Sequence, residues 1–267
     1  MKRVASAFLL FAMIQSTSLQ AAITTNEVSY PAGTVTAKGF FACPDDAGTH
    51  PAVLVVHEWW GLNDYARKRA SMLAEMGYVA LAVDMYGDGK TADHPADATA
   101  FMSAITENMP EGRARFEAAL KFLSAQPGVD PSKIAAIGYC FGGGLVLQMA
   151  AEGVPGLIGV ASFHGGPAAQ IPDGVKPTAS MLVLHGEADS MIPMSAIEDF
   201  KKRMTDASVV NKVVTYPDAK HGFTNPGADE KAEKFGVPVG YQEKADKESW
   251  EELSKFLSQI FGQTSAA

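Results

Sequence analysis

Cysteine and closely spaced metal ligands are scarce in this sequence, which argues against a metal-stabilised fold. Only two cysteines, Cys43 and Cys140, occur among 267 residues, and they are far apart along the chain. Structural zinc sites need paired ligands at short spacing. His57 and Glu58 begin like a zinc-peptidase signature, but the second histidine of H-E-x-x-H would fall at Gly61. We therefore expect no metal site.

Positive charge is also in short supply. The chain carries 22 Lys and Arg against 30 Asp and Glu, a formal net charge of −8, and no basic run interrupts the acidic balance. Nucleic-acid binding needs a clustered positive face, so we expect no nucleic-acid partner. An acidic surface favours solubility instead.

The apolar run near the N-terminus is too short to anchor the protein in a membrane. It covers 4–14, well below the ~20 residues that a transmembrane helix needs. Lys2 and Arg3 precede it, and small residues follow as far as Ala22, which is the layout of a secretory signal peptide. We expect a leader over 1–22 and export of the mature chain, 23–267, to the periplasm or the medium, without membrane contact once the leader is removed.

Apolar runs of strand length alternate with longer segments that suit helices along 23–267. This alternation predicts one α/β domain, with a mostly parallel sheet covered by helices on both faces. No linker divides the domain. Gly and Pro residues interrupt 225–239, so no helix is expected there. The expected strands are 28–32, 34–43, 52–57, 78–84, 133–139, 157–163, 181–185 and 212–216, and the expected helices are 63–76, 98–108, 111–124, 145–151, 194–204 and 242–261.

One strand of this series runs directly into a glycine-rich turn around Cys140. Gly138 lies two residues before the cysteine and Gly142 two residues after it. G-x-C-x-G is the thiol version of the nucleophile elbow, a turn that lifts one side chain above the sheet. Glycine is needed because a β-carbon would block the close approach of neighbouring backbone. A free cysteine that only packs in the core is the alternative, but the pattern favours a nucleophile.

Two cysteines in an exported protein would ordinarily suggest a disulfide. A bridge between Cys43 and Cys140 would consume the nucleophile. We therefore expect two free thiols, with Cys43 in a packing role.

A thiol nucleophile needs a base, and the base needs a group that orients it. Of the six histidines, only His221 fits the chain order nucleophile, acid, histidine. Asp189 follows the end of strand 181–185, where its carboxylate can reach the imidazole and stabilise the imidazolium. Glu187 is the rival acid. The alternatives are that Asp189 only caps a turn and that His221 is a surface loop residue. Both are less favoured because the elbow is present.

The end of strand 52–57 offers a second group of residues beside the elbow. Glu58 follows this strand, and the backbone N–H groups of Trp59 and Phe141 are the candidate donors of an oxyanion hole. Losing one such donor typically costs ~10²–10³ in rate. Trp59 and Trp60 are also expected to wall an apolar pocket, although core packing explains Trp60 equally well.

These residues give the chain a resemblance to the dienelactone hydrolase family, the cysteine branch of the α/β-hydrolase fold. The resemblance covers essentially the whole mature chain, and Gly-Tyr-Cys-Phe-Gly-Gly is its most specific part. It implies a Cys140–His221–Asp189 triad in which Glu58 touches the thiol. It also implies hydrolysis of a strained enol-lactone through a thioester, without a cofactor. The motifs that carry it are His57–Leu62, Asp84–Gly87, Gly138–Gly143, Asp189 and His221–Phe223.

Two departures from the family pattern concern the substrate. Family members that act on dienelactone carry arginines where this chain has Asp88 and Asn225. A guanidinium fork suits a substrate carboxylate, and the nearby Lys90 is not an equivalent clamp. We expect weak dienelactone turnover and better turnover of uncharged lactones or short esters. The resemblance places the substrate pocket at Trp60, Tyr86, Asp88, Tyr139 and Asn225.

The second of these departures also concerns how the thiol is activated. In the family, substrate binding is thought to free the carboxylate matching Glu58 so that it deprotonates the cysteine, with the help of the arginine that Asn225 replaces. A thiol near its reference pKa of ~8.5 is only a few per cent thiolate at neutral pH. We hypothesise that Glu58 stays partly protonated and keeps Cys140 neutral until substrate arrives.

The leading function is therefore a monomeric hydrolase that cleaves carboxylic esters or lactones of small molecules. A thioesterase or acyltransferase would use the same triad, and the sequence leaves this alternative open. A non-catalytic exported binding protein is less favoured, because a scaffold has no need of Cys140, Asp189 and His221 together.

Overall fold

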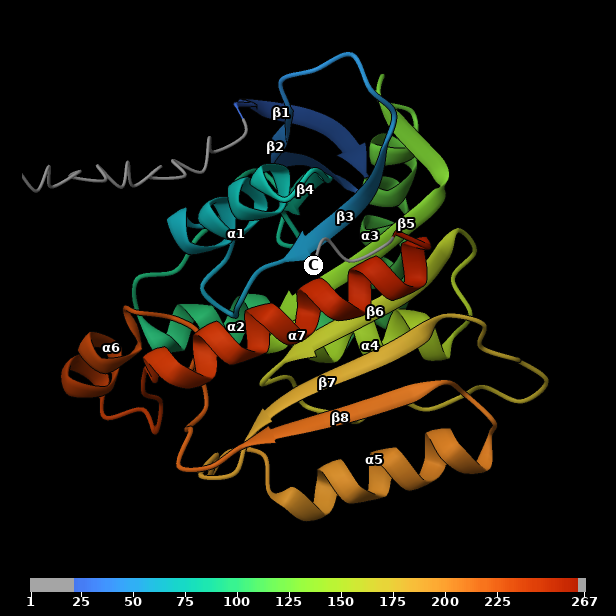
Figure 1. Ribbon diagram of the computed structural model, residues 1–267. Helices are drawn as coiled ribbons and strands as arrows, with labels where there is room; N and C mark the ends of the chain where they lie inside the picture. Colours follow the sequence, from blue (N-terminus) through green and yellow to red (C-terminus); the bar gives the residue numbers. More distant parts are fainter. Residues whose placement is uncertain (1–21, 264–267) are drawn as a thin grey trace, which may run out of the picture.

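A central eight-stranded sheet organises the computed structural model, which describes residues 22–263 (Figure 1). The expected leader lies outside the described residues, apart from Ala22. The strands lie in the order β1-β2-β4-β3-β5-β6-β7-β8; β1 and β2 run antiparallel at one edge, and the remaining pairs from β4 to β8 are parallel. The strands are β1 (Ile23–Ala32), β2 (Val35–Pro44), β3 (His50–Val56), β4 (Val79–Val83), β5 (Val129–Tyr139), β6 (Leu157–Phe163), β7 (Ser180–Gly186) and β8 (Asn211–Tyr216).

Helices cover both faces of this sheet. The apolar sides of α1 and α7 form one core layer with it, whereas α3, α4 and α5 form the other. None of the described helices has the length and apolar character that a bilayer crossing needs. The helices are α1 (Asp64–Glu75), α2 (Pro95–Thr106), α3 (Met109–Ser124), α4 (Phe141–Ala151), α5 (Met194–Asp206), α6 (Ala228–Phe235) and α7 (Glu243–Phe261).

The predicted α/β architecture with a mostly parallel sheet is confirmed. The central strands are buried on both faces, as their continuous apolar runs indicate. In the register of the sheet, Gly138 of β5 lies beside Val56 of β3 and Ser162 of β6. The carboxyl ends of neighbouring parallel strands therefore meet at one edge, where ligands bind in open α/β sheets.

Two helices differ from the expectation. α4 begins at Phe141, immediately after the cysteine, because the glycines that follow continue the helix instead of extending the turn. α6 occupies 228–235 within the segment where no helix was expected. The punctuating residues flank α6 and do not interrupt it: Gly227 precedes the helix, and Gly236 ends it with φ +67°.

Candidate active site

Cys140 sits on a strained turn between β5 and α4. Its φ of 51° and ψ of −114° place a non-glycine residue in a conformation that L-residues rarely adopt, a strain that persists only where the surrounding structure imposes it. The flanking glycines make this possible. A β-carbon at Gly138 would lie 2.1 Å from the carbonyl oxygen of Gly142, and one at Gly142 would lie 2.4 Å from that of Val56. The turn therefore has the geometry of a nucleophile elbow.

A buried histidine, His164, accepts a hydrogen bond from the backbone of the elbow. The backbone N–H of Cys140 is shared between the carbonyl oxygen of Phe163, at 3.0 Å, and Nδ1 of His164, at 3.2 Å. Since Nδ1 accepts, Nε2 carries the hydrogen and donates to Thr224 Oγ1 at 2.8 Å. Burial lowers the pKa of His164 well below its usual value, so the ring is neutral. His164 was not among the predicted site residues, although its place directly after β6 was the available signal.

His221 and Asp189 form a buried hydrogen-bonded pair next to the elbow. Asp189 Oδ2 lies 2.9 Å from Nδ1 of His221. The other carboxylate oxygen, Oδ1, accepts the backbone N–H groups of Met191 at 2.8 Å and Ile192 at 3.0 Å, which fix its orientation. The rival acid, Glu187, is exposed and accepts a hydrogen bond from the Thr215 hydroxyl instead. Between the two acids, Asp189 is the one that orients the imidazole.

The surroundings of His221 favour its charged form. Burial alone would lower its pKa, but the negative charge of Cys140 and the hydrogen bond with Asp189 outweigh that effect and raise the pKa to about 10. Nε2, the nitrogen opposite Asp189, is buried and has no hydrogen-bond partner among residues 22–263. Cys140 is thus close enough to His221 for an ionised sulfur to raise the pKa of the ring.

Glu58 lies at the same edge of the sheet with a partner of its own. The Asn225 amide donates to Glu58 Oε2 at 2.6 Å, and Asn225 Oδ1 accepts the Gly227 N–H at 2.9 Å, which fixes the orientation of the amide. Burial raises the pKa of Glu58, whereas the bond from Asn225 lowers it. Glu58 was expected to lack the partner that the family's arginine provides, and in the structure the Asn225 amide bonds it instead. No hydrogen bond joins Glu58 to Cys140 within the described chain, although both line one small cleft.

Two buried side chains hold the backbone of Trp59, the expected oxyanion donor. The Tyr86 hydroxyl donates to the carbonyl oxygen of Trp59 at 2.8 Å. His57 Nδ1 lies 2.5 Å from the carbonyl oxygen of Glu58, and His57 Nε2 accepts from the Met85 N–H at 3.3 Å. Burial lowers the pKa of His57 to about 4, so this ring is neutral. The second expected donor is the N–H of Phe141, the first residue of α4, where helix N–H groups lack an intrahelical acceptor.

Comparison with known proteins identifies the group to which this chain belongs. The model of the dienelactone hydrolase family matches residues 37–261. The chain is a member of the dienelactone hydrolase family. Membership supports a hydrolase that acts on ester bonds.

Relatives of several origins support this assignment. A dienelactone hydrolase-like promiscuous phosphotriesterase from metagenomic libraries is 34% identical with a TM-score of 0.83, over 90% of this chain and 99% of that structure. Protein usf of Aquifex pyrophilus is 32% identical over 203 residues, 74% of this chain and 86% of its own length. A protein of Aquifex aeolicus that carries the provisional name carboxymethylenebutenolidase is 30% identical over 235 residues, 86% of this chain and 96% of its own length. An α/β hydrolase from a deep-sea metagenome, 18% identical with a TM-score of 0.68, shares the fold.

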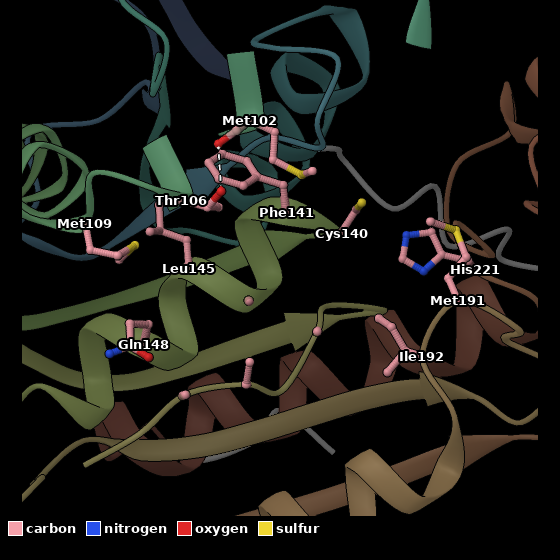
Figure 2. Close-up of a pocket in the computed structure, with 14 residues that line it drawn as sticks. Met102, Thr106, Met109, Cys140, Phe141, Leu145, Gln148, Met191, Ile192 and His221 are labelled. Atoms are coloured by element: carbon pink, nitrogen blue, oxygen red, sulfur yellow. Dashed lines mark hydrogen bonds between the residues drawn. The ribbon is translucent and has the colours of Figure 1, made fainter. Parts of the chain in front are cut away.

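An apolar cavity of about 480 Å³ opens beside Cys140 in this family member (Figure 2). It extends from Cys140 and His221 along α4 towards α2 and α3. None of its lining residues is Asp, Glu, Lys or Arg. The large apolar side chains that line it are Met102, Met109, Phe141, Leu145, Met191 and Ile192.

A second cleft, of about 960 Å³, is lined by Trp60 and by several charged side chains. The small cleft that contains Glu58 and Cys140 shares Trp60, Asn225 and Lys231 with it. Asp88 faces this charged cleft and forms an ion pair of 3.7 Å with Lys90. The pocket residues Trp60, Asp88 and Asn225 expected from the sequence therefore line the charged cleft and not the apolar cavity.

Two further residues expected in the pocket are buried beneath it. Tyr139 is fully buried and stacks on Phe163 with ring centroids 4.7 Å apart, because the residue before the nucleophile points to the opposite face of the strand. Tyr86 is buried and orients the Trp59 peptide. Both predictions of pocket lining were wrong. Cys43 and Cys140 are free thiols, and within residues 22–263 no three His, Cys, Asp or Glu side chains gather as metal ligands.

Proposed function

We propose that this chain hydrolyses uncharged carboxylic esters or lactones through a thioester on Cys140. The strained elbow is the observation that carries the proposal, because it presents a half-buried thiol to a cavity that the His221 ring also lines. Strain of this kind is kept at functional sites. Asp189 orients the imidazole, and when Cys140 loses its proton on substrate binding, the ionised sulfur and Asp189 together favour the imidazolium form of His221.

The reaction needs only groups of this chain and one water molecule. The thiolate attacks the carbonyl carbon, forming a C–S bond, and the C–O bond to the alcohol then breaks. The imidazolium of His221 gives its proton to the departing alkoxide. Neutral His221 next takes a proton from water, whose oxygen attacks the thioester and releases the acid, while the thiolate leaves and is restored. A lactone gives a single open-chain hydroxy acid by the same two steps.

Backbone groups at the start of α4 and after β3 stabilise the negative charge that develops on the carbonyl oxygen. The N–H groups of Phe141 and Trp59 are the proposed donors, and Tyr86 and His57 hold the Trp59 peptide in place. Donors fixed before the reaction lose no energy to reorganisation. Glu58 is proposed to hold the resting thiol neutral, since burial raises the pKa of its carboxyl group.

We further propose that the enzyme acts on small molecules outside the cytoplasm as a monomer. The proposal of export rests on the basic and apolar layout of residues 1–22. The preference for uncharged substrates rests on the lining of the apolar cavity, in which no Asp, Glu, Lys or Arg accompanies His221.

Intact-mass analysis tests the thioester directly. The purified chain is mixed with activated esters and lactones and quenched in acid within seconds. We expect an acyl adduct on the wild-type chain that maps to Cys140 and disappears with time, a more persistent oxygen-linked adduct on Cys140→Ser and no adduct on Cys140→Ala. An adduct of equal yield on Cys140→Ala, or one that maps to Cys43 in the wild type, would overturn the proposal. Added acceptor alcohols, with product analysis, separate hydrolysis from acyl transfer.

A further inference from the structure

The apolar cavity follows one face of α4 away from the nucleophile. Its lining residues recur at Cys140, which caps the helix, and at Gly144 and Gln148 within it, a spacing of four that keeps them on one side. Eight residues of helix rise about 12 Å. The cavity lining therefore extends roughly 12 Å along α4 from Cys140 to Gln148.

The polar side chains at the far end of this cavity carry no charge and are hydrogen-bonded to other groups of the protein. Gln148 Nε2 donates to Glu152 at 2.8 Å, and Gln148 Oε1 accepts the Gln170 N–H at 3.2 Å. The Thr106 hydroxyl donates to the backbone oxygen of Met102 at 3.2 Å. A charged group placed there would meet no oppositely charged side chain of the lining, and the part of its hydration that the apolar walls displace would be lost at a cost. The cavity therefore selects an apolar chain end.

The position of His221 decides which part of an ester fills the cavity. Figure 2 shows Cys140 between His221 on one side and Leu145, Gln148 and Met109 on the other. The leaving alcohol must lie on the side of His221, because it receives its proton from that ring. The acyl group then lies on the opposite side, along α4.

We infer that the enzyme is selective for esters of unbranched, uncharged, medium-chain acids, whose acyl chain lies along α4. An extended chain advances about 1.2 Å per bond, so eight bonds from the sulfur to the eighth carbon span roughly 10 Å, and the terminal methyl group fills the remaining ~2 Å of the ~12 Å. Met102, Met109 and Met191 line the cavity, and methionine adapts its shape to flexible apolar ligands. The inference rests on the proposed hydrolase function and adds its acyl specificity.

A substitution at the far rim tests the acyl assignment. Thr106 is exposed at the end of α2, so Thr106→Trp shortens the cavity without disturbing the core. Ala104→Trp is the matched control, because Ala104 is exposed on the same helix and does not line the cavity. The readout is kcat/KM for p-nitrophenyl esters from acetyl to dodecanoyl, with the melting temperature of each variant as a check of folding.

We expect wild-type kcat/KM to rise at least tenfold from acetyl to octanoyl and to fall again at dodecanoyl. Thr106→Trp should lower the octanoyl-to-acetyl ratio tenfold or more, and Ala104→Trp should leave it within twofold. A flat wild-type profile, or equal ratios in the two variants, would overturn the acyl assignment while the proposed hydrolase stands. If Cys140 forms no adduct and no ester of any length is turned over, the hydrolase proposal itself fails, and the acyl assignment with it.

A second substitution tests the charge argument with a gain of activity. The suberic acid half-ester of p-nitrophenol has the length of the octanoyl ester and ends in a carboxylate. We expect the wild-type enzyme to turn it over at least 100-fold more slowly than the octanoyl ester, and Thr106→Arg to improve kcat/KM for the half-ester at least tenfold. Equal wild-type turnover of the two esters, or no gain in Thr106→Arg, would contradict an apolar chain end.

Discussion

Replacing Asp189 by Asn separates the orientation of His221 from the packing of the site. The two backbone N–H groups at Oδ1 require an acceptor, so the amide oxygen of Asn should keep that place. The amide nitrogen then faces Nδ1 of His221, at the position of Oδ2 in the present 2.9 Å hydrogen bond. Because the amide donates, Nδ1 becomes the acceptor and Nε2 carries the hydrogen. His221 can then no longer take a proton from the thiol.

The change of tautomer at His221 sets the size of the effect on kcat. The same change in a serine triad lowers kcat by about 10⁴, equivalent to about 5.5 kcal/mol of barrier at 1.36 kcal/mol per factor of ten. A thiol is more acidic than a hydroxyl and depends less on its base. We therefore expect Asp189→Asn to lower kcat about 10²–10⁴-fold for p-nitrophenyl acetate. The loss of a negative charge also lowers the pKa of His221 from about 10, so the thiolate forms only at higher pH.

Two measurements check this prediction. Steady-state kinetics gives kcat and KM separately, and the rate of thiol alkylation against pH should shift its midpoint upward in Asp189→Asn. Glu187→Gln is the matched control, since Glu187 lies on the same loop but bonds Thr215, and its kcat should change less than twofold. An Asp189→Asn enzyme within tenfold of wild type, or an equal loss in Glu187→Gln, would refute the assignment of the acid.

Two further substitutions test Glu58 and the elbow. Asn225→Ala removes the hydrogen bond that lowers the pKa of Glu58. In a plot of the thiol alkylation rate against pH, the inflection that depends on Glu58 should therefore move to higher pH in Asn225→Ala and vanish in Glu58→Gln. An inflection that stays at the wild-type pH in Asn225→Ala would contradict this role of Glu58. Gly138→Ala places a β-carbon 2.1 Å from a backbone oxygen and should cost about 3 kcal/mol or more in urea unfolding. Gly166→Ala, whose added carbon meets nothing within 4 Å, is its control and should cost less than about 1 kcal/mol.

Features encoded in neighbouring residues were predictable from the sequence. The elbow is local: an apolar strand, Gly138, Cys140 and Gly142 lie within a few residues, and steric exclusion of β-carbons gives that pattern its meaning. His221 followed from chain order. The continuous apolar strands predicted a parallel sheet, because only burial on both faces tolerates them. The position of Tyr139 was also predictable in principle, since alternation along β5 points it away from the site of Cys140.

The sequence by itself thus determined the fold class and the strained elbow at Cys140, because steric and hydrophobic constraints act within short segments. The tertiary structure alone decided between Asp189 and Glu187, which are two residues apart and differ only in where the loop aims them. It also decided that the Asn225 amide meets Glu58, and that the apolar cavity is built from α2, α3 and α4. Contacts between segments that are distant in the chain depend on how helices pack on the sheet, and no local pattern records that packing.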